Sequence, residues 1–328
     1  DLTLLLAALM LLSGAYVAWS LGANDGANSM GTAVGAGVRT MREAVLIVGV
    51  FGLLGAATMG AGVIKTIGRG IVPLDAIEPH LASLIAVSAM FATGLWLTVA
   101  TYLRLPVSTT HSSVGAVAGA GLAAGNVPIF WSTFGDIFIA WIATPLGSFV
   151  LAFVLYKLVH ALVLPRVAIS NRVWGWLLTL SGIYMAFSWG ANDVANATGV
   201  IVGSGLMTPS WAAVLGGAGI AIGVATWGYK VMQTVGSGIT ALAPAMAFVA
   251  EFAAAMNVQI YTVFGIPVST THAIVGAVVG VGFVHGRTAL NAKTARDIVA
   301  AWAGTPVGAG LLAFVLYHVF QLVFGGGG

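Results

Sequence analysis

Long apolar runs separated by short polar segments make up most of this chain. Runs of about membrane-spanning length occupy residues 2–21, 44–64, 81–103, 130–156, 173–189, 211–232, 244–264 and 300–324. None shows the strict alternation of a membrane strand, whereas about 20 apolar residues suffice for a helix to cross a bilayer. The pattern therefore predicts an all-α integral membrane protein.

The composition agrees with this fold class. Hydrophobic residues make up 59% of the 328 residues and charged residues only 6%, whereas about 25% of a soluble domain is charged. The chain has no cysteine, which excludes disulfides and thiolate metal sites. The formal charge of +3 comes from too few residues to indicate a nucleic-acid partner.

A polar seven-residue stretch occurs twice inside the apolar sequence. Residues 22–28 read Gly-Ala-Asn-Asp-Gly-Ala-Asn, and residues 190–196, which begin 168 positions later (190 − 22), read Gly-Ala-Asn-Asp-Val-Ala-Asn. Each copy places a carboxylate, Asp25 or Asp193, where hydrocarbon is expected. A carboxylate near the bilayer centre costs roughly 2.5–3.5 kcal/mol on insertion scales. Two carboxylates that each carry this cost, in the same seven-residue motif, indicate a paired functional site.

A second motif is repeated with a slightly shorter spacing. Residues 106–111 and residues 267–272 both read Pro-Val-Ser-Thr-Thr-His, 161 positions apart (267 − 106). A further match follows each copy, since residues 141–145 read Trp-Ile-Ala-Thr-Pro and residues 302–306 read Trp-Ala-Gly-Thr-Pro. The chain therefore consists of two related halves.

The loop charges indicate how the halves are oriented. In the first half the basic loop follows the Asn-Asp motif and carries Arg39 and Arg42, while the matching loop of the second half has no Lys or Arg. In the second half the basic loop is 287–296, and its counterpart has none. Because cytoplasmic loops are enriched in Lys and Arg, matching loops face opposite sides of the membrane, which is typical of inverted-topology repeats.

Inverted repeats need an odd number of crossings in each half. Five crossings satisfy this if each Asn-Asp motif is a break within one helix, and the parity is kept if residues 81–124 form a re-entrant hairpin. The predicted organisation is a first repeat at 1–156, a cytoplasmic linker at 157–172 and a second repeat at 173–328, with both termini outside.

The Asn-Asp motif has the chemistry of a cation site. Gly and Asn weaken helices, so an unwound segment with free backbone carbonyls is expected here. Carboxylate, carboxamide and carbonyl oxygens are the ligands of a hard cation. The alternative is a set of polar residues that bond to neighbouring helices. The candidate sodium ligands are Ala23, Asn24, Asp25 and Asn28 in the first half and Ala191, Asn192, Asp193 and Asn196 in the second.

The Ser-Thr-Thr motif has the chemistry of an anion site. Pro106 and Pro267 discourage helix before them, and Ser is a good N-cap, so a helix should begin at each motif. Hydroxyls at a helix N-terminus bind anions without Lys or Arg. The alternative is ordinary capping. The candidate phosphate ligands are Ser108, Thr109, Thr110, Ser269, Thr270 and Thr271, with Gln233 as a further donor.

Three other polar residues lie in or near spans. Glu251 has no acidic counterpart in the first half, which suggests an extra cation or proton site, although a buried hydrogen bond explains it equally well.

His111 and His272 fit packing better than catalysis, because a Ser or Thr nucleophile and its base are rarely adjacent in sequence and no third orienting residue is apparent. No phosphate-binding loop of an ATPase is present. The chain is therefore not expected to be an enzyme.

The two motifs, each present twice, resemble the inorganic phosphate transporter (PiT) family. With its connecting spans the resemblance covers nearly the whole chain. It implies symport of inorganic phosphate with Na⁺, or with H⁺ in some bacterial and plant members, and some relatives carry sulfate. Members often form oligomers. The short linker 157–172 departs from the animal members, which have a large cytoplasmic domain at this place.

These inferences predict a multi-pass transporter of the cell membrane that moves phosphate together with a cation, preferably sodium, by alternating access. Two sodium ions would offset Asp25 and Asp193, and two helix N-termini supply roughly +0.5 each, which matches a monovalent phosphate. The expected partners are inorganic phosphate, Na⁺ as coupling ion, the lipid bilayer and a further copy of the chain, with no other cofactor and no nucleic acid. A proton-coupled phosphate or sulfate permease and an uncoupled anion channel remain as alternatives.

Overall fold

The computed structural model describes residues 2–232, 242–284, 286 and 292–325. Within these residues the secondary structure is entirely helical, as the apolar pattern predicts. The helices are α1 (Leu2–Asp25), α2 (Ala27–Gly35), α3 (Met41–Met59), α4 (Ala61–Arg69), α5 (Pro79–Tyr102), α6 (Thr109–Ala124), α7 (Trp131–Leu158), the π-helical turn η1 (Val159–Val163), α8 (Asn171–Gly203), α9 (Pro209–Trp227), α11 (Pro244–Val263), α12 (Thr270–Phe283) and α13 (Ala292–Phe324).

Seven helical stretches of the described chain are long and apolar enough to cross a membrane. Helix α8 has 33 residues but is not among them, and it carries the second Asn-Asp motif. Helices α6 and α12 have only 16 and 14 residues and pack against the preceding helices α5 and α11. They are too short to cross a bilayer alone, which favours the re-entrant hairpin over two separate crossings.

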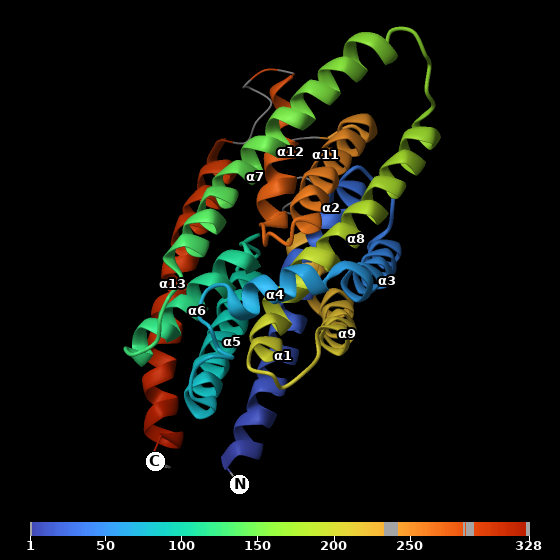
Figure 1. Cartoon of the computed structure of the whole chain (residues 1–328). Coiled ribbons are helices and arrows are strands. Elements are labelled where there is room, and N and C mark those ends of the chain that lie inside the picture. Colours follow the sequence, from blue (N-terminus) through green and yellow to red (C-terminus); the bar gives the residue numbers. More distant parts are fainter. Residues whose placement is uncertain (1, 233–241, 285, 287–291, 326–328) are drawn as a thin grey trace.

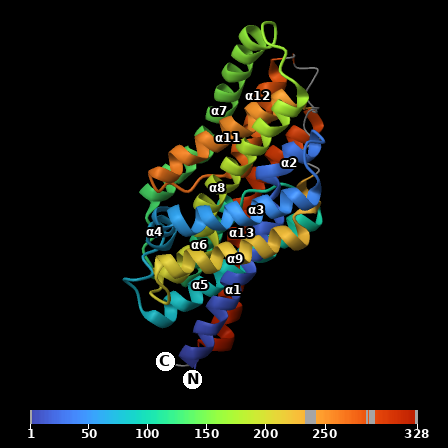
Figure 2. The same ribbon diagram turned by 90° about the vertical axis from the view of Figure 1, so that its right-hand side faces the viewer.

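The path of the chain agrees with two inverted repeats. Both termini lie at one end of the molecule, and the connection from α7 to α8 lies at the opposite end (Figure 1). Each half therefore ends on the side opposite to the one where it began. A second view, in which α3 and α9 lie beside each other across the long helices, shows the same placement of the termini (Figure 2).

The two halves exchange packing partners. The short helix α6 packs against α13 of the second half, and its counterpart α12 packs against α7 of the first half. In the same way α3 packs against α8, and α9 packs against α1. Each half thus supplies the surface on which the other half's motif-bearing helices rest.

Glycines bring the exchanged helices into backbone contact. A Cβ atom added to Gly55 of α3 would lie 1.9 Å from the carbonyl oxygen of Phe187, and one added to Gly223 of α9 would lie 2.0 Å from that of Trp19. Each residue of the second pair stands 168 positions from its counterpart in the first (223 − 55 and 187 − 19), so the same contact is made twice. Small residues at such crossings are typical of membrane helix packing.

The predicted break at the Asn-Asp motif occurs in the first copy and not in the second. Helix α1 ends at Asp25 and α2 begins at Ala27; Gly26 between them keeps helical dihedral angles (φ −55°, ψ −25°), and its amide donates to the Gly22 carbonyl at 3.2 Å. Helix α8 runs through the second motif without interruption. In the second copy close packing overrides the weak helix propensity of Gly and Asn, so the carbonyl of Ala191 is not released by unwinding.

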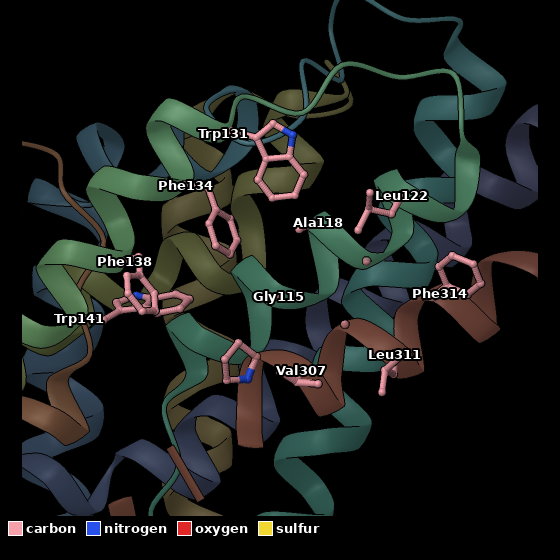
Figure 3. A pocket seen from close by; sticks show the side chains of 13 residues that line it. Gly115, Ala118, Leu122, Trp131, Phe134, Phe138, Trp141, Val307, Leu311 and Phe314 are labelled. Carbon is pink, nitrogen blue, oxygen red and sulfur yellow. The ribbon is translucent and has the colours of Figure 1, made fainter. Parts of the chain in front are cut away.

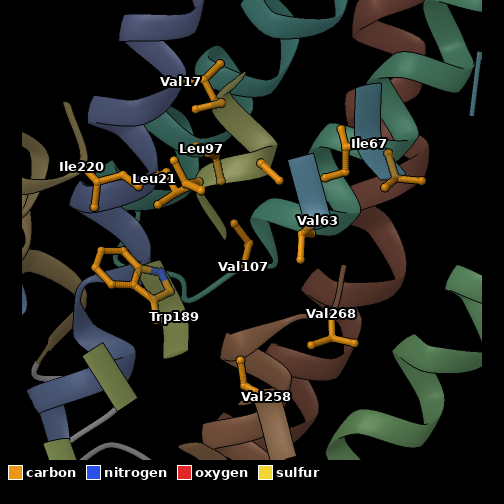
Figure 4. Packing of buried hydrophobic residues seen from close by; sticks show 14 of the residues in the cluster. Val17, Leu21, Val63, Ile67, Leu97, Val107, Trp189, Ile220, Val258 and Val268 are labelled. Atoms are coloured by element: carbon orange, nitrogen blue, oxygen red, sulfur yellow. The ribbon is translucent and has the colours of Figure 1, made fainter. Parts of the chain in front are cut away.

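Buried hydrophobic side chains flank both motifs in the sequence, and Figure 4 shows Leu21, Val107, Trp189 and Val268 among them. Val107 and Val268, which precede the capping serines, are almost completely buried. Trp189 is fully buried one turn before Asp193, and Leu21 lies one turn before Asp25. These hydrophobic neighbours offer few hydrogen-bonding groups, so the polar side chains of the motifs depend on one another for partners.

We expect that adding a methyl group at the exchanged contacts destabilises the fold. Gly55→Ala and Gly223→Ala force a backbone oxygen and a Cβ apart, and overpacking of this kind costs about 1–3 kcal/mol. Gly135→Ala in α7 is the matched control, because a Cβ there meets nothing within 4 Å. Thermal unfolding in detergent should show midpoints below the wild-type value for Gly55→Ala and Gly223→Ala. The midpoint of Gly135→Ala should equal that of the wild type. Equal midpoints for all three would contradict the backbone contact.

Candidate functional site

The Ser-Thr-Thr motifs cap the two short helices. The hydroxyl of Ser108 accepts a hydrogen bond from the amide of His111 at 3.1 Å, and that of Ser269 accepts from the amide of His272 at 3.1 Å. The predicted helix starts are therefore confirmed. Both serines are buried, so the positive ends of α6 and α12 lie inside the protein.

The first asparagine of each Asn-Asp motif holds the segment that leads into these caps. Asn24 donates to the Thr101 hydroxyl at 3.0 Å and the Leu105 carbonyl at 3.1 Å, and its oxygen accepts from the Val107 amide at 3.3 Å. Asn192 makes the matching bonds.

The partners of Asn192 are the Thr262 hydroxyl at 2.9 Å, the Ile266 carbonyl at 3.1 Å and the Val268 amide at 3.1 Å. The sequence predicts Asn24 and Asn192 as cation ligands, with bonds to neighbouring helices as the alternative, and in the structure they make such bonds. Thr101 and Thr262 were not predicted, although both recur at the 161-residue spacing of the Ser-Thr-Thr motif.

The two aspartates are buried among threonine hydroxyls. Thr109 donates to Asp25 at 2.5 Å, and Thr271 of the other half donates to its second oxygen at 3.3 Å. Thr270 donates to Asp193 at 2.9 Å. Each carboxylate is 1% exposed, and the two lie close enough to interact directly. The structure thus brings both predicted acidic residues into one site.

The second asparagine of each motif reaches across to the opposite half. Asn28 donates to the hydroxyls of Thr270 at 3.1 Å and Thr271 at 2.9 Å. Asn196 donates to the hydroxyl of Thr110 at 3.2 Å. The site is therefore assembled from both halves and cannot be formed by one alone.

The backbone adds a second pair of crossing contacts. Thr110 donates to the carbonyl of Val268 at 3.0 Å. The single proton of the Thr271 hydroxyl can go either to the Val107 carbonyl at 3.1 Å or to Asp25 at 3.3 Å. These bonds fix the two helix N-termini beside each other.

Several oxygens of the site are left without a partner. The amide oxygens of Asn28 and Asn196 and one carboxylate oxygen of Asp193 are buried and accept no hydrogen bond within the described chain. None of the described Lys or Arg side chains is buried. Unpartnered buried acceptors are costly, and oxygen acceptors next to carboxylates are the donor set that a hard cation takes.

Comparisons with known proteins identify the family. A family model described as the phosphate transporter family matches residues 21–171 and 166–313. The chain belongs to the phosphate transporter family. The two matched segments agree with the two repeats, and a family of transporters agrees with the expectation that the chain is not an enzyme.

Relatives and a solved structure cover almost the whole transporter. It is 33% identical to a protein of Pyrococcus furiosus whose name is "putative phosphate permease", with 96% of each chain covered. It is 32% identical to the chloroplastic inorganic phosphate transporter 2-1 of Arabidopsis thaliana, over 98% of this chain and 73% of that one. A solved structure titled the sodium-dependent phosphate transporter is 31% identical, with a TM-score of 0.90 and coverage of 97% of this chain and 99% of that chain.

The remaining predicted residues of the transporter lie at two places. Glu251 on α11 is fully buried and accepts a short hydrogen bond from the Thr32 hydroxyl of α2, while its other oxygen has no partner among the described residues. Thr32 stands one helical turn beyond Asn28, so Glu251 lies near the site along α2. Thr32 was not predicted. Gln233 lies outside the described residues.

The two histidines belong to an aromatic cluster behind the threonines. Ring centroids are 4.3 Å apart for His111 and His272, 3.8 Å for His111 and Trp141, and 3.6 Å for His272 and Trp302. His272 Nδ1 lies 3.4 Å from the Trp141 carbonyl. This carbonyl receives no helical hydrogen bond from residue 145, because Pro145 has no N–H. This packing role agrees with the interpretation of the histidines as packing residues.

An apolar groove of about 400 Å³ lies beside the site (Figure 3). Helices α6, α7 and α13 line it with Trp131, Phe134, Leu311 and other apolar residues. It offers almost no hydrogen-bonding group to an anion, so the motifs rather than this groove are the candidate transport site.

We expect the Asn24 contacts to stabilise the fold whether or not an ion is bound. Asn24→Ala leaves the Val107 amide and the Leu105 carbonyl without their partner, at a cost of about 1–3 kcal/mol for each group. Ser29→Ala is the matched control on α2, because the Ser29 hydroxyl is buried without a partner. Thermal unfolding in sodium-free detergent solution should show a lower midpoint for Asn24→Ala only. If both variants melt like the wild type, the contacts contribute nothing.

Proposed function

We propose that this transporter carries inorganic phosphate across the cell membrane together with sodium ions by alternating access between the inverted halves. The observation that supports it most is the pair of buried aspartates that share threonine hydroxyls from both halves beside unpartnered amide oxygens. The name of the similar solved structure, a sodium-dependent phosphate transporter, points to the same ion.

We place the sodium ions at the Asn-Asp motifs. Asp25, Asp193, Asn28 and Asn196 are the preferred ligands, since the amide oxygens and one Asp193 oxygen have no partner. The other four candidates from the sequence have weaker geometry. Asn24 and Asn192 already accept from backbone amides of their own halves. The Ala191 carbonyl becomes a ligand only where α8 unwinds, and the Ala23 carbonyl lies next to the break between α1 and α2.

We place the phosphate at the N-termini of α6 and α12. The hydroxyls of Thr109, Thr110, Thr270 and Thr271 point to the space shared by both halves, and the first amides of each helix have no acceptor within it. Ser108 and Ser269 contribute through their caps, which hold the helix ends in place. Gln233 remains a candidate donor.

The threonine hydroxyls supply a physical route for coupling. A hydroxyl has one proton, so Thr109 and Thr270 can donate either to an aspartate or to phosphate. Without a cation the carboxylates hold these protons by hydrogen bonding and also repel an anion in a low-dielectric site. A sodium ion on each carboxylate removes the repulsion and frees the hydroxyls. Phosphate then binds where sodium has bound, and each ligand raises the affinity for the other.

Proton coupling is the second candidate, and it rests on Glu251. Its carboxyl group is buried near the site with one unpartnered oxygen, so protonation would remove its charge as a third cation would. Sulfate as cargo and an uncoupled anion channel also remain as alternatives, and the paired aspartates argue against the channel because it needs no coupling site.

We further propose that the linker between the halves faces the cytoplasm and both termini face outside. The linker carries Lys157, Arg166 and Arg172, all exposed, and basic loops are retained in the cytoplasm. A homo-oligomer is the proposed assembly, on the basis of the family resemblance.

Phosphate uptake should depend on sodium through the aspartates. In proteoliposomes with an imposed sodium gradient we expect uphill uptake of labelled phosphate by the wild type. Asp25→Asn and Asp193→Asn keep the shape but remove a charge, so each should lower the sodium dependence and reduce uptake at least tenfold. Asp136→Asn, an exposed carboxylate of α7, is the control and should transport normally.

Three conditions separate the hypotheses: a sodium gradient alone, a proton gradient alone, and no gradient of either ion. Uptake driven by protons alone would favour the Glu251 alternative, and downhill movement without coupling would favour a channel. Sodium dependence that survives both aspartate substitutions would refute the placement of the ions.

Removing one shared hydroxyl should weaken phosphate binding. Thr110→Val and Thr271→Val preserve shape, and a hydrogen bond to a charged group contributes about 1.5–3 kcal/mol, so affinity should fall by about ten- to a hundredfold. Thr58→Val is the control, because this exposed hydroxyl donates only to its own helix, at the Leu54 carbonyl. Phosphate affinity is measured by equilibrium binding at saturating sodium. Unchanged affinity in both site variants would mean that the motif threonines serve only the fold.

A further inference from the structure

A second polar pocket lies at the end of the molecule that carries the linker. Its volume is about 540 Å³, and its walls are the turn after α2 at residues 36–39, the first turns of α8 and the start of α11 at Pro244. Neither sequence motif reaches it, and none of the described residues proposed above for phosphate or sodium lines it.

Two arginines give this pocket its charge. Arg39 is held in place, because its Nε donates to the Thr179 hydroxyl at 2.9 Å and its guanidinium lies 4.6 Å from the Trp176 ring centroid. Its side chain is 19% exposed and also lies 3.7 Å from Glu43. Arg172, the second residue of α8, is exposed at the same pocket.

The surroundings favour an anion. None of the described residues that line the pocket is Asp or Glu. The N-terminus of α8 contributes a positive dipole end next to Arg172. Arginine presents a planar set of donors that matches phosphate oxygens, and a guanidinium already fixed on an aromatic ring loses little freedom on binding.

The inverted repeat shows that the fold does not require these residues. At the 168-residue spacing, the counterpart of Arg39 is Met207, that of Arg172 is Leu4, and that of Trp176 is Ala8. The corresponding place on the other side of the molecule therefore has the same helices without the charge. An excess of basic residues on the cytoplasmic side explains the sign of the charge, but not its concentration around one pocket with a stacked tryptophan.

We propose that this pocket binds a phosphate group, supplied by the head group of an anionic phospholipid or by free inorganic phosphate. Trp176 and Val173 are 56% and 48% exposed on the same turn of α8. The mouth of the pocket therefore opens beside residues of the kind found at the membrane interface, where tryptophan is enriched and basic side chains meet anionic lipids.

The test uses the fluorescence of Trp176 in the full chain in sodium-free detergent solution. The signal is the difference between the wild type and Trp176→Phe upon titration with phosphatidylglycerol, with phosphatidylcholine or with inorganic phosphate. We expect a saturable response to an anionic ligand that weakens about tenfold in Arg172→Gln. Arg42→Gln is the matched control, because Arg42 is exposed near the same turn but does not line the pocket.

Each outcome decides the proposal. A response to phosphatidylglycerol but not to phosphatidylcholine, weakened in Arg172→Gln, assigns the pocket to a lipid head group. A response to inorganic phosphate with the same loss assigns it to the free anion. No response to either, or a response that Arg172→Gln leaves unchanged, overturns it. The absence of sodium keeps the central site, which is proposed to need that ion, from contributing to the signal.

Discussion

The burial of two carboxylates next to each other is the constraint on which the rest of the structure depends. Asp25 and Asp193 are removed from water and face one another in a medium that screens charge poorly. They are tolerated because Thr109, Thr270 and Thr271 donate to them. Those threonines stand at the start of short helices that must begin inside the protein. The capping serines, the prolines before them and the asparagines that tie down each entry segment all serve that requirement.

The same constraint explains why the polar network crosses between the halves. Within one half, Asn24 bonds to the segment of its own repeat and shapes the wall of the site. Asn28 and Thr110 instead bond to groups of the other half. The halves therefore meet through polar contacts at the centre and through glycine contacts further out. A rearrangement of one half relative to the other alters the central bonds first, which is the property that alternating access needs.

Much of the site could be predicted from the sequence, because each of the two motifs occurs twice. The fold class, the inverted repeat and the helix starts at Ser108 and Ser269 follow from apolar length, loop charge and capping chemistry. The break at the Asn-Asp motif occurs at Gly26 in the first copy, but α8 runs through the second copy, since propensity is a weak guide where packing is close. The partners Thr101 and Thr32 were missed because a threonine inside a span looks like any other until its neighbours are known. Gln233 lies outside the described residues and remains a prediction.

The exchanged packing of the helices has a consequence for the history of the fold. Helix α6 rests on α13, α12 rests on α7, and glycines at Gly55 and Gly223 fit backbone atoms of the opposite repeat. A single repeat would leave these faces open and would hold only half of the carboxylate pair. An ancestral gene that encoded one repeat would therefore have had to insert its product into the membrane in both orientations. Two antiparallel copies could then complete one another, and fusion of the genes would have made that pairing permanent.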